Sequence, residues 1–186
     1  MKKSILLLLL LGITFFGCND NLDNSIVTTH NISKIIEQQP PAPENPTIVS
    51  VSKLIDGKQG GWIEWDTSYV NGNGREIYSY ISLHIPKNAF EGTREIVIQP
   101  NPEETTIQLF PEMAFKKSLK LYYEVWGVNL RALGYLTSGR CDFAYFDDYG
   151  NIELISTKKS TVDLHNDKIR VLNAKLTHFS RYGWVR

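Results

Sequence analysis

Downstream of residue 48, apolar side chains recur at every second position in short runs, and this spacing most limits how the chain can fold. The run Ile81–Ile85 alternates apolar and polar residues, and Leu121, Tyr123 and Val125 recur with the same period. Successive side chains of a β-strand point to opposite faces, so the pattern predicts strands with one buried side. No long run with the helical period of 3.6 residues follows, and an all-β fold is expected.

Turn-forming sequences separate these runs. They are Asn71–Gly74, Pro100–Pro102 and Asp147–Asn151, and further strand-like runs are Arg94–Gln99, Thr105–Phe110, Asp142–Phe146 and Asn151–Ile155. Many short strands at regular spacing predict an antiparallel β-sandwich. The connection Gly127–Arg140 is longer than a hairpin turn, and we expect it to be functional or mobile.

The first 17 residues carry the three parts of a secretory signal. Lys2 and Lys3 precede an apolar stretch, and small Gly17 stands before Cys18. The 13 residues from Ile5 to Gly17 are fewer than the roughly 20 that a bilayer-spanning helix needs. The Phe-Phe-Gly-Cys ending resembles the lipobox of bacterial lipoproteins. This resemblance implies cleavage before Cys18 and diacylation of its thiol, with palmitate among the acyl chains, and two chains anchor stably.

Residues 18–47 are expected to form the lipidated N-terminus and a stalk, followed by the folded domain at 48–186. The segment Gln38–Pro46 is rich in proline, which favours an extended spacer. The polar start Asn19–Asn24 resembles the export tags of some surface lipoproteins of Bacteroidota. We therefore expect a protein of the cell envelope, anchored in the outer membrane through its lipid and either periplasmic or exposed at the cell surface.

The charge balance argues against nucleic acid as a partner. The chain has 20 basic and 20 acidic residues, and removal of Lys2 and Lys3 with the signal leaves 18 against 20. A nucleic-acid-binding surface needs an excess of basic residues on one face.

Neither a disulfide nor a metal site is expected. With Cys18 lipidated, Cys141 has no partner and is interpreted as a small core residue. His30, His84 and His165 are scattered without the spacing of metal ligands, and Asp147–Asn151 fits a turn better than a calcium loop. The domain is expected to rely on its own core, without a cofactor.

A further resemblance covers residues 55–186. It rests on the Ile-Pro-x-x-Ala-Phe element at Ile85–Phe90, on Met113–Leu121 and Phe143–Asp147, and on the closing His-Phe-Ser-Arg-Tyr at His178–Tyr182. These segments resemble the ZU-five domain shared by zonula occludens proteins, ankyrins, Unc-five netrin receptors and bacterial envelope proteins. The resemblance implies a β-sandwich that binds proteins or serves as a structural module. The chain departs from the family where Lys117–Ser118 replaces a usual proline, and in the long Gly127–Arg140 connection.

In some relatives of that family, a His-Phe-Ser sequence cuts itself. The resemblance implies that Ser180 would attack the carbonyl carbon of Phe179 while His178 moves the proton. Against this, only seven residues follow the cut. If the strand is unbroken, Leu172, Ala174, Leu176, His178 and Ser180 share one face, which favours a hydrogen-bonded core histidine. We expect the structural role, with self-processing as the alternative.

Two rows of aromatic and acidic residues are candidates for ligand binding. In the first, Trp62, Glu64 and Asp66 are expected to point away from Ile63 and Trp65. The second comprises Tyr122, Glu124 and Trp126. An exposed Trp can stack on a sugar ring while carboxylates bind its hydroxyl groups; alternatively, both rows pack beneath the long connection or the stalk. We expect a non-enzymatic binding or structural module for a protein or polysaccharide.

Replacing Cys18 by Ser should abolish lipid attachment, because the acyl anchor requires the thiol. In a bacterial host, the parent chain should incorporate labelled palmitate and fractionate with membranes, whereas Cys18→Ser should be unlabelled and soluble. Cys141→Ser is the matched control and should retain the label. Labelling of Cys18→Ser would contradict the lipoprotein interpretation.

Overall fold

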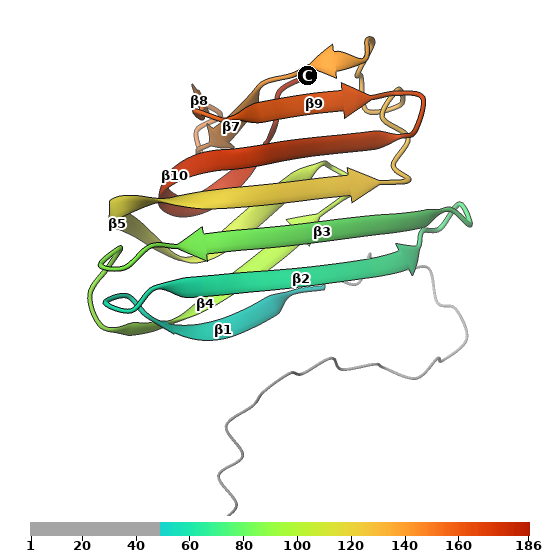
Figure 1. The fold of residues 1–186 in the computed structure, drawn as a ribbon. Coiled ribbons are helices and arrows are strands. Elements are labelled where there is room, and N and C mark those ends of the chain that lie inside the picture. The colour runs from blue at the N-terminus through green and yellow to red at the C-terminus, as the bar shows by residue number, and fades with distance from the viewer. Residues whose placement is uncertain (1–48) are drawn as a thin grey trace, which may run out of the picture. The chain divides into compact units, whose positions relative to one another are not determined.

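The computed structural model describes residues 49–186, and the predicted signal, Cys18 and nearly all of the stalk lie outside this range. All regular elements in the described part are β-strands (Figure 1). They are β1 (Val51–Asp56), β2 (Gly61–Val70), β3 (Glu76–Ile85), β4 (Thr93–Asn101), β5 (Thr106–Trp126), β6 (Gly139–Arg140), β7 (Phe143–Phe146), β8 (Ile152–Leu154), β9 (Lys159–Asp163) and β10 (Lys168–Trp184). Every strand pair is antiparallel, so the predicted all-β antiparallel fold is confirmed. Within residues 49–186, no helix is long and apolar enough to span a membrane.

The long strands β5 and β10 connect all parts of the sheet. The start of β5 pairs with β4 and its end pairs with β3. Similarly, the start of β10 pairs with β9 and its end with β7, while β5 and β10 pair with each other along most of their length. The ten strands therefore belong to one branched sheet. Residues 49–186 therefore do not show the two separate sheets that the predicted sandwich implies.

Strand β5 is longer than the sequence pattern indicates. The separate runs Thr105–Phe110 and Leu121–Trp126 belong to one strand of 21 residues. None of the side chains at 111–118 is buried, yet Met113 and Ala114 still pair with β10. Alternating hydrophobicity reports burial and not backbone pairing, and in this segment only Met113 and Phe115 pack against the core, both partly buried, so its sequence signal is weak.

The pairing of β10 with β5 is bulged at three places, between Val171 and Ala174, Leu176 and His178, and Phe179 and Arg181, with the extra residue in β10 at the first and the extra residues in β5 at the other two. Asn173 has a left-handed backbone with φ of 53° at the first of them. Each bulge changes which side chains face the core. The expectation of one face from Leu172 to Ser180 is therefore wrong: Phe179 is buried, whereas His178 is half-buried.

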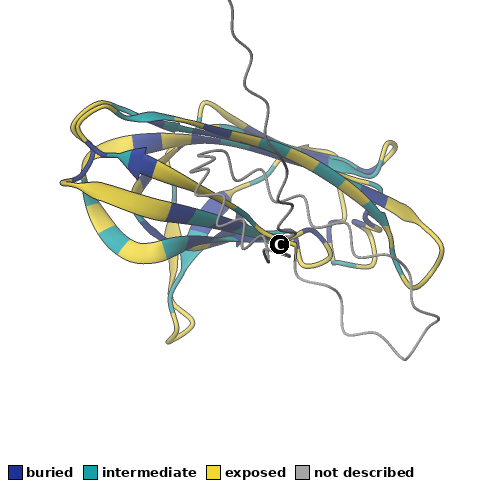
Figure 2. Ribbon diagram, turned by 90° about the horizontal axis from the view of Figure 1, so that it is seen from below, coloured by how far each residue is buried: buried dark blue, intermediate teal, exposed yellow. Residues whose placement is uncertain are grey.

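The core contains apolar side chains from both branches of the sheet, and buried positions recur along the strands (Figure 2). Its largest buried side chains include Tyr123, Phe143, Phe179 and Tyr182. The long Gly127–Arg140 connection contributes to the same core.

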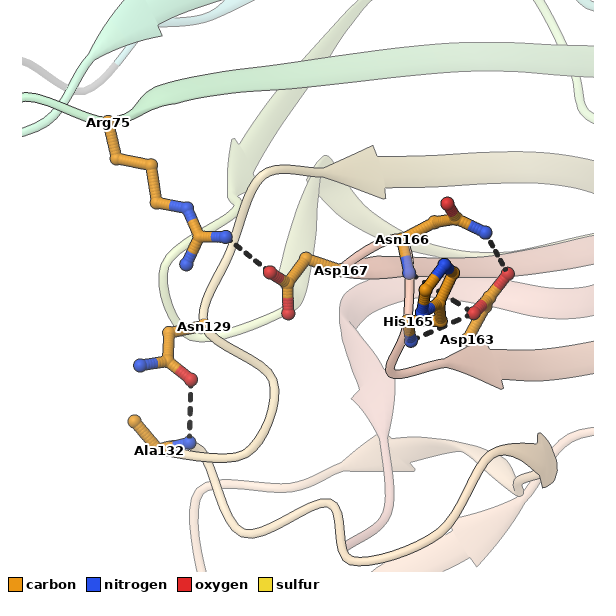
Figure 3. Close-up of polar contacts among 7 residues, drawn as sticks. All are labelled: Arg75, Asn129, Ala132, Asp163, His165, Asn166 and Asp167. Carbon is orange, nitrogen blue, oxygen red and sulfur yellow. Dashed lines mark hydrogen bonds and ion pairs between the residues drawn. The ribbon is translucent and has the colours of Figure 1, made fainter.

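In that connection, Val128, Leu130 and Tyr135 are buried. The Tyr135 hydroxyl lies 3.0 Å from Thr105 Oγ1. The first turn of the connection is closed by the Asn129 side chain, whose Oδ1 accepts from the Ala132 amide (Figure 3). The connection therefore packs against the domain as part of its core.

Gly127 is required where β5 ends. It has φ of +82°, and its amide donates to the Asp167 carbonyl at 3.0 Å. Arg75 also binds the Asp167 carboxylate, so this junction joins the ends of β3, β5 and β10 (Figure 3). A Cβ atom at Gly127 would lie 2.1 Å from the Glu76 carbonyl oxygen, which belongs to the backbone of β3.

Gly127→Ala should lower the free energy of unfolding by at least about 3 kcal/mol, because left-handed strain and a backbone clash act together. Gly74→Ala is the matched control, since Gly74 has φ of +74° but a Cβ atom there would meet no other atom within 4 Å. It should cost only the strain of about 1–2 kcal/mol. Urea unfolding of both variants measures the difference, and equal losses would rule out the clash.

Candidate functional site

The two predicted rows of aromatic and acidic residues form one surface. Strand β3 lies between β2 and β5, so its outward side chains fill the space between the rows. Trp62 is opposite His84 on β3, and Tyr78 of β3 is opposite Trp126. We call this surface the aromatic face; it comprises Trp62, Glu64, Asp66, Tyr78, Tyr80, Ser82, His84, Tyr122, Glu124, Trp126, Lys168 and Arg170.

The inward and outward directions predicted for β2 are confirmed. Ile63 is buried and Trp65 packs against the core, whereas Glu64 and Asp66 are exposed. Trp62 is 54% exposed and Trp126 is 38% exposed, so the long connection does not cover the face. The alternative in which the stalk covers this face involves residues outside 49–186.

Aromatic pairs cross the strands throughout this face. The ring centroids of Trp62 and His84 are 4.4 Å apart, and those of Tyr78 and Trp126 are 4.8 Å apart. Tyr80 and Tyr122 meet edge to face at 5.5 Å. Cross-strand contacts of this kind restrict the rotamers of both partners. The rings are therefore held in place before any ligand binds.

Glu124 is a buried carboxylate in the centre of the aromatic face, only 5% exposed. Its Oε2 accepts from the Tyr122 hydroxyl at 2.7 Å and lies 3.0 Å from Lys168 Nζ. Arg170 Nη1 lies 3.9 Å from the same oxygen. A buried charge needs such partners to offset its desolvation. Glu124 therefore positions Tyr122, Lys168 and Arg170 and has little surface left for a ligand.

The hydroxyls of Tyr78 and Tyr122 remain protonated at neutral pH. Burial and the adjacent Glu124 raise the pKa of Tyr122 to about 12. Burial, followed by the charges of Asp66 and Glu124, also raises the pKa of Tyr78. Both hydroxyls can therefore donate hydrogen bonds over the ordinary pH range.

The exposed carboxylates lie at the β2 side of the face. Glu64 is opposite Ser82, whose hydroxyl donates to Glu64 Oε1 at 3.4 Å. Asp66 is opposite Tyr80. Both carboxylates thus lie beside aromatic rings and retain free acceptor capacity for a ligand's hydroxyl groups.

Sequence reasoning missed the contributions of β3 and β10. The alternation Ile77, Ser79, Ile81 and Leu83 inward would have placed Tyr78 and Tyr80 outward, so β3 did carry a usable signal. Lys168 and Arg170 had no such signal. They join the face only because β10 pairs with the end of β5, more than 40 residues earlier in the chain.

The His178–Ser180 segment lies on β10, away from the aromatic face. The Tyr182 hydroxyl donates to the His178 carbonyl at 2.6 Å, and the His178 ring packs against Tyr145 with centroids 4.5 Å apart. Phe179 is buried in the core. In the described part of the chain, no hydrogen bond joins the Ser180 hydroxyl to His178. The expected structural role stays a prediction, with self-cleavage between Phe179 and Ser180 as the untested alternative.

The other candidates have structural surroundings. The Asp147 carboxylate accepts from the amides of Tyr149 and Asn151 and from the Asn151 side chain, and these bonds lower its pKa. It closes the β7–β8 turn, as the turn interpretation predicts. Cys141 is half-buried, its Sγ lies 3.3 Å from Ser160 Oγ, and burial raises its pKa. Between residues 49 and 186, no cluster of three or more His, Cys, Asp or Glu residues could hold a metal ion.

Tyr122→Phe should reduce the loss of stability at alkaline pH. Because the pKa of Tyr122 is about 12 in the folded protein and ordinarily 10, its stabilising contribution is complete below pH 10. It is lost as the pH rises toward 12, where the folded state also loses the proton. Unfolding free energies across this range should therefore fall less steeply in Tyr122→Phe. Tyr149→Phe, at a residue 92% exposed, should match the parent protein, and coincident slopes for all three would contradict the assignment.

No family model, curated protein or solved structure matches this chain. The ZU-five resemblance therefore stays a prediction.

Proposed function

We propose that the protein is a non-enzymatic lipoprotein of the cell envelope whose folded domain binds a polysaccharide through the aromatic face. The proposal rests on one observation. Outward-facing aromatic rings lie on the adjacent strands β2, β3 and β5, with carboxylates and hydroxyls between them. A sugar ring has apolar C–H faces and polar hydroxyl edges. Aromatic rings interspersed with hydrogen-bonding groups complement both.

The dimensions of the face favour an extended ligand. Trp62 lies beside His84 and Trp126 beside Tyr78, six residues apart along β3. At about 3.3 Å per residue, the two tryptophans are separated by roughly 20 Å along the strand. This length suits a chain of several sugar units.

Trp62 is the better stacking platform, because it is the more exposed tryptophan. The Trp126 ring is held between the Tyr78 ring and the Lys168 ammonium, so a ligand would meet mainly its remaining edge. Glu124 contributes by positioning its neighbours, because its carboxylate is occupied by neighbouring donors.

The architecture also fits a tethered binding module. We infer that the two branches of the sheet pack as the layers of a β-sandwich, as the ZU-five resemblance implies. This is supported by β5 and β10, which run through both branches, and by a core that joins Ile81 of β3 to Ile98 of β4. A lipid at Cys18 and a proline-rich stalk would keep such a domain near the membrane while leaving the aromatic face accessible.

Trp62→Ala and Trp126→Ala test the aromatic face. Affinity electrophoresis and calorimetry with a panel of envelope and extracellular polysaccharides should reveal a ligand for the parent protein. Trp62→Ala should weaken binding about tenfold, as expected for an aromatic hot spot, and Trp126→Ala should weaken it less, because Tyr78 and Lys168 already contact the Trp126 ring. Tyr149→Ala is the control, since it removes an exposed aromatic residue outside the face.

Retention of full affinity in both tryptophan variants would show that the ligand binds elsewhere. Binding to no polysaccharide would overturn the proposal. Capture of a purified envelope protein that both tryptophan variants lose, without any polysaccharide binding, would reassign the face to a protein ligand.

A further inference from the structure

A hollow of about 720 Å³ extends the aromatic face across β10 and β9. Trp126 lines one side, and Lys159, Lys168 and Arg170 line the rest with Thr161 and Asn166. Across the strands, Trp126 is opposite Lys168, and Arg170 is opposite Thr161. Lys168 is therefore a direct neighbour of Trp126, and Arg170 lies opposite Glu124 of the same face.

The hollow carries an excess of positive charge. Three cations face one lining carboxylate, Asp163, which leaves an excess of two; counting Glu124 beneath the face still leaves one. Lys159 is exposed, and no carboxylate of the described residues lies within ion-pair distance of it. This excess is local, because the whole chain has equal numbers of acidic and basic residues.

Asp163 does not offset these cations by direct contact. Its Oδ1 accepts from the amides of His165 and Asn166, and its Oδ2 accepts from the Asn166 side chain at 2.7 Å (Figure 3). These bonds use the carboxylate to close the β9–β10 turn and lower its pKa. The Asp163 carboxylate is therefore used to close the turn and does not pair with the cations of the hollow.

Two of the cations are held in place. Lys168 Nζ lies 4.4 Å from the centre of the Trp126 ring and 3.0 Å from Glu124. Arg170 shares the same carboxylate and also donates to Thr161 Oγ1 at 3.4 Å. One carboxylate divided between two cations leaves each only partly neutralised. The cations are ordered before a ligand arrives, which reduces the entropy lost on binding.

We infer that the ligand of this face is an acidic polysaccharide, whose uronic acid carboxylates bind in the hollow beside Trp126. This inference rests on the proposed function and specifies its substrate class. Charge changes across the face, from Glu64 and Asp66 on β2 to Lys159, Lys168 and Arg170 on β9 and β10. The units at the basic end bind the cations through their carboxylates, and the units over β2 meet Glu64 and Asp66 through their hydroxyl groups.

The test compares polygalacturonate with its methyl ester, which has the same backbone without free carboxylates. Alginate, dextran and dextran sulfate complete the panel, and affinities are measured at low and high salt. The parent protein should bind polygalacturonate or alginate at least about fivefold more tightly than the ester or dextran, with the difference lost at high salt. Lys159→Glu should weaken uronate binding about fivefold and leave binding of the ester unchanged.

Lys58→Glu is the matched control. It makes the same charge change at an exposed lysine in the β1–β2 turn, outside the hollow, and should retain the parent affinity. Thermal unfolding of both variants should match the parent, because both lysines are exposed. An equal loss in both variants would indicate non-specific attraction and overturn the inference.

The remaining outcomes separate the inference from the proposed function. Equal affinity for charged and neutral polysaccharides, with dependence on Trp62, would overturn the acidic ligand and leave the binding face standing. Binding of dextran sulfate alone would overturn the uronate assignment. Binding to none of the five polysaccharides would overturn both.

Discussion

The pairing of β5 with β10 is the interaction on which the rest of the structure depends. Each strand runs through both branches of the sheet, and β3, β4, β7 and β9 pair with one or the other of them. Their long pairing requires the chain to bring residues 106–126 beside 168–184, and the bulges between the two strands adjust which side chains reach the core. Phe179 occupies a core position between two of these irregularities, whereas the neighbouring His178 is only half-buried.

The aromatic face depends on the same pairing through Glu124. A carboxylate on the outward side of a central strand becomes buried only because Tyr122 beside it and Lys168 and Arg170 from β10 lie over it. Once buried, it must retain those partners, which orders the aromatic centre of the face and its basic margin together. The proposed polysaccharide site and its preference for acidic units are thus two consequences of one buried charge.

Much of the face was accessible to pattern analysis, because strand alternation assigns directions reliably. Trp62, Glu64 and Asp66 were predicted to point outward, and the same argument applied to β3 would have added Tyr78 and Tyr80. The alternation of buried and exposed residues does not predict the structure where a strand pairs without full burial or where the pairing is bulged. The middle of β5 pairs while burying its side chains only in part, and the bulges between β5 and β10 break the period that placed His178 in the core.

By itself, the sequence determined the all-β antiparallel class, the main turns and the inward and outward sides of individual strands, since these follow from local spacing and turn chemistry. Only the tertiary structure decided which strands are neighbours. It placed β3 between the two aromatic rows and β10 beside β5, so that Lys168 and Arg170 meet Trp126 and Glu124. The physical reason is that strand pairing joins residues distant in the chain, and no local pattern encodes which partner buries a given charge.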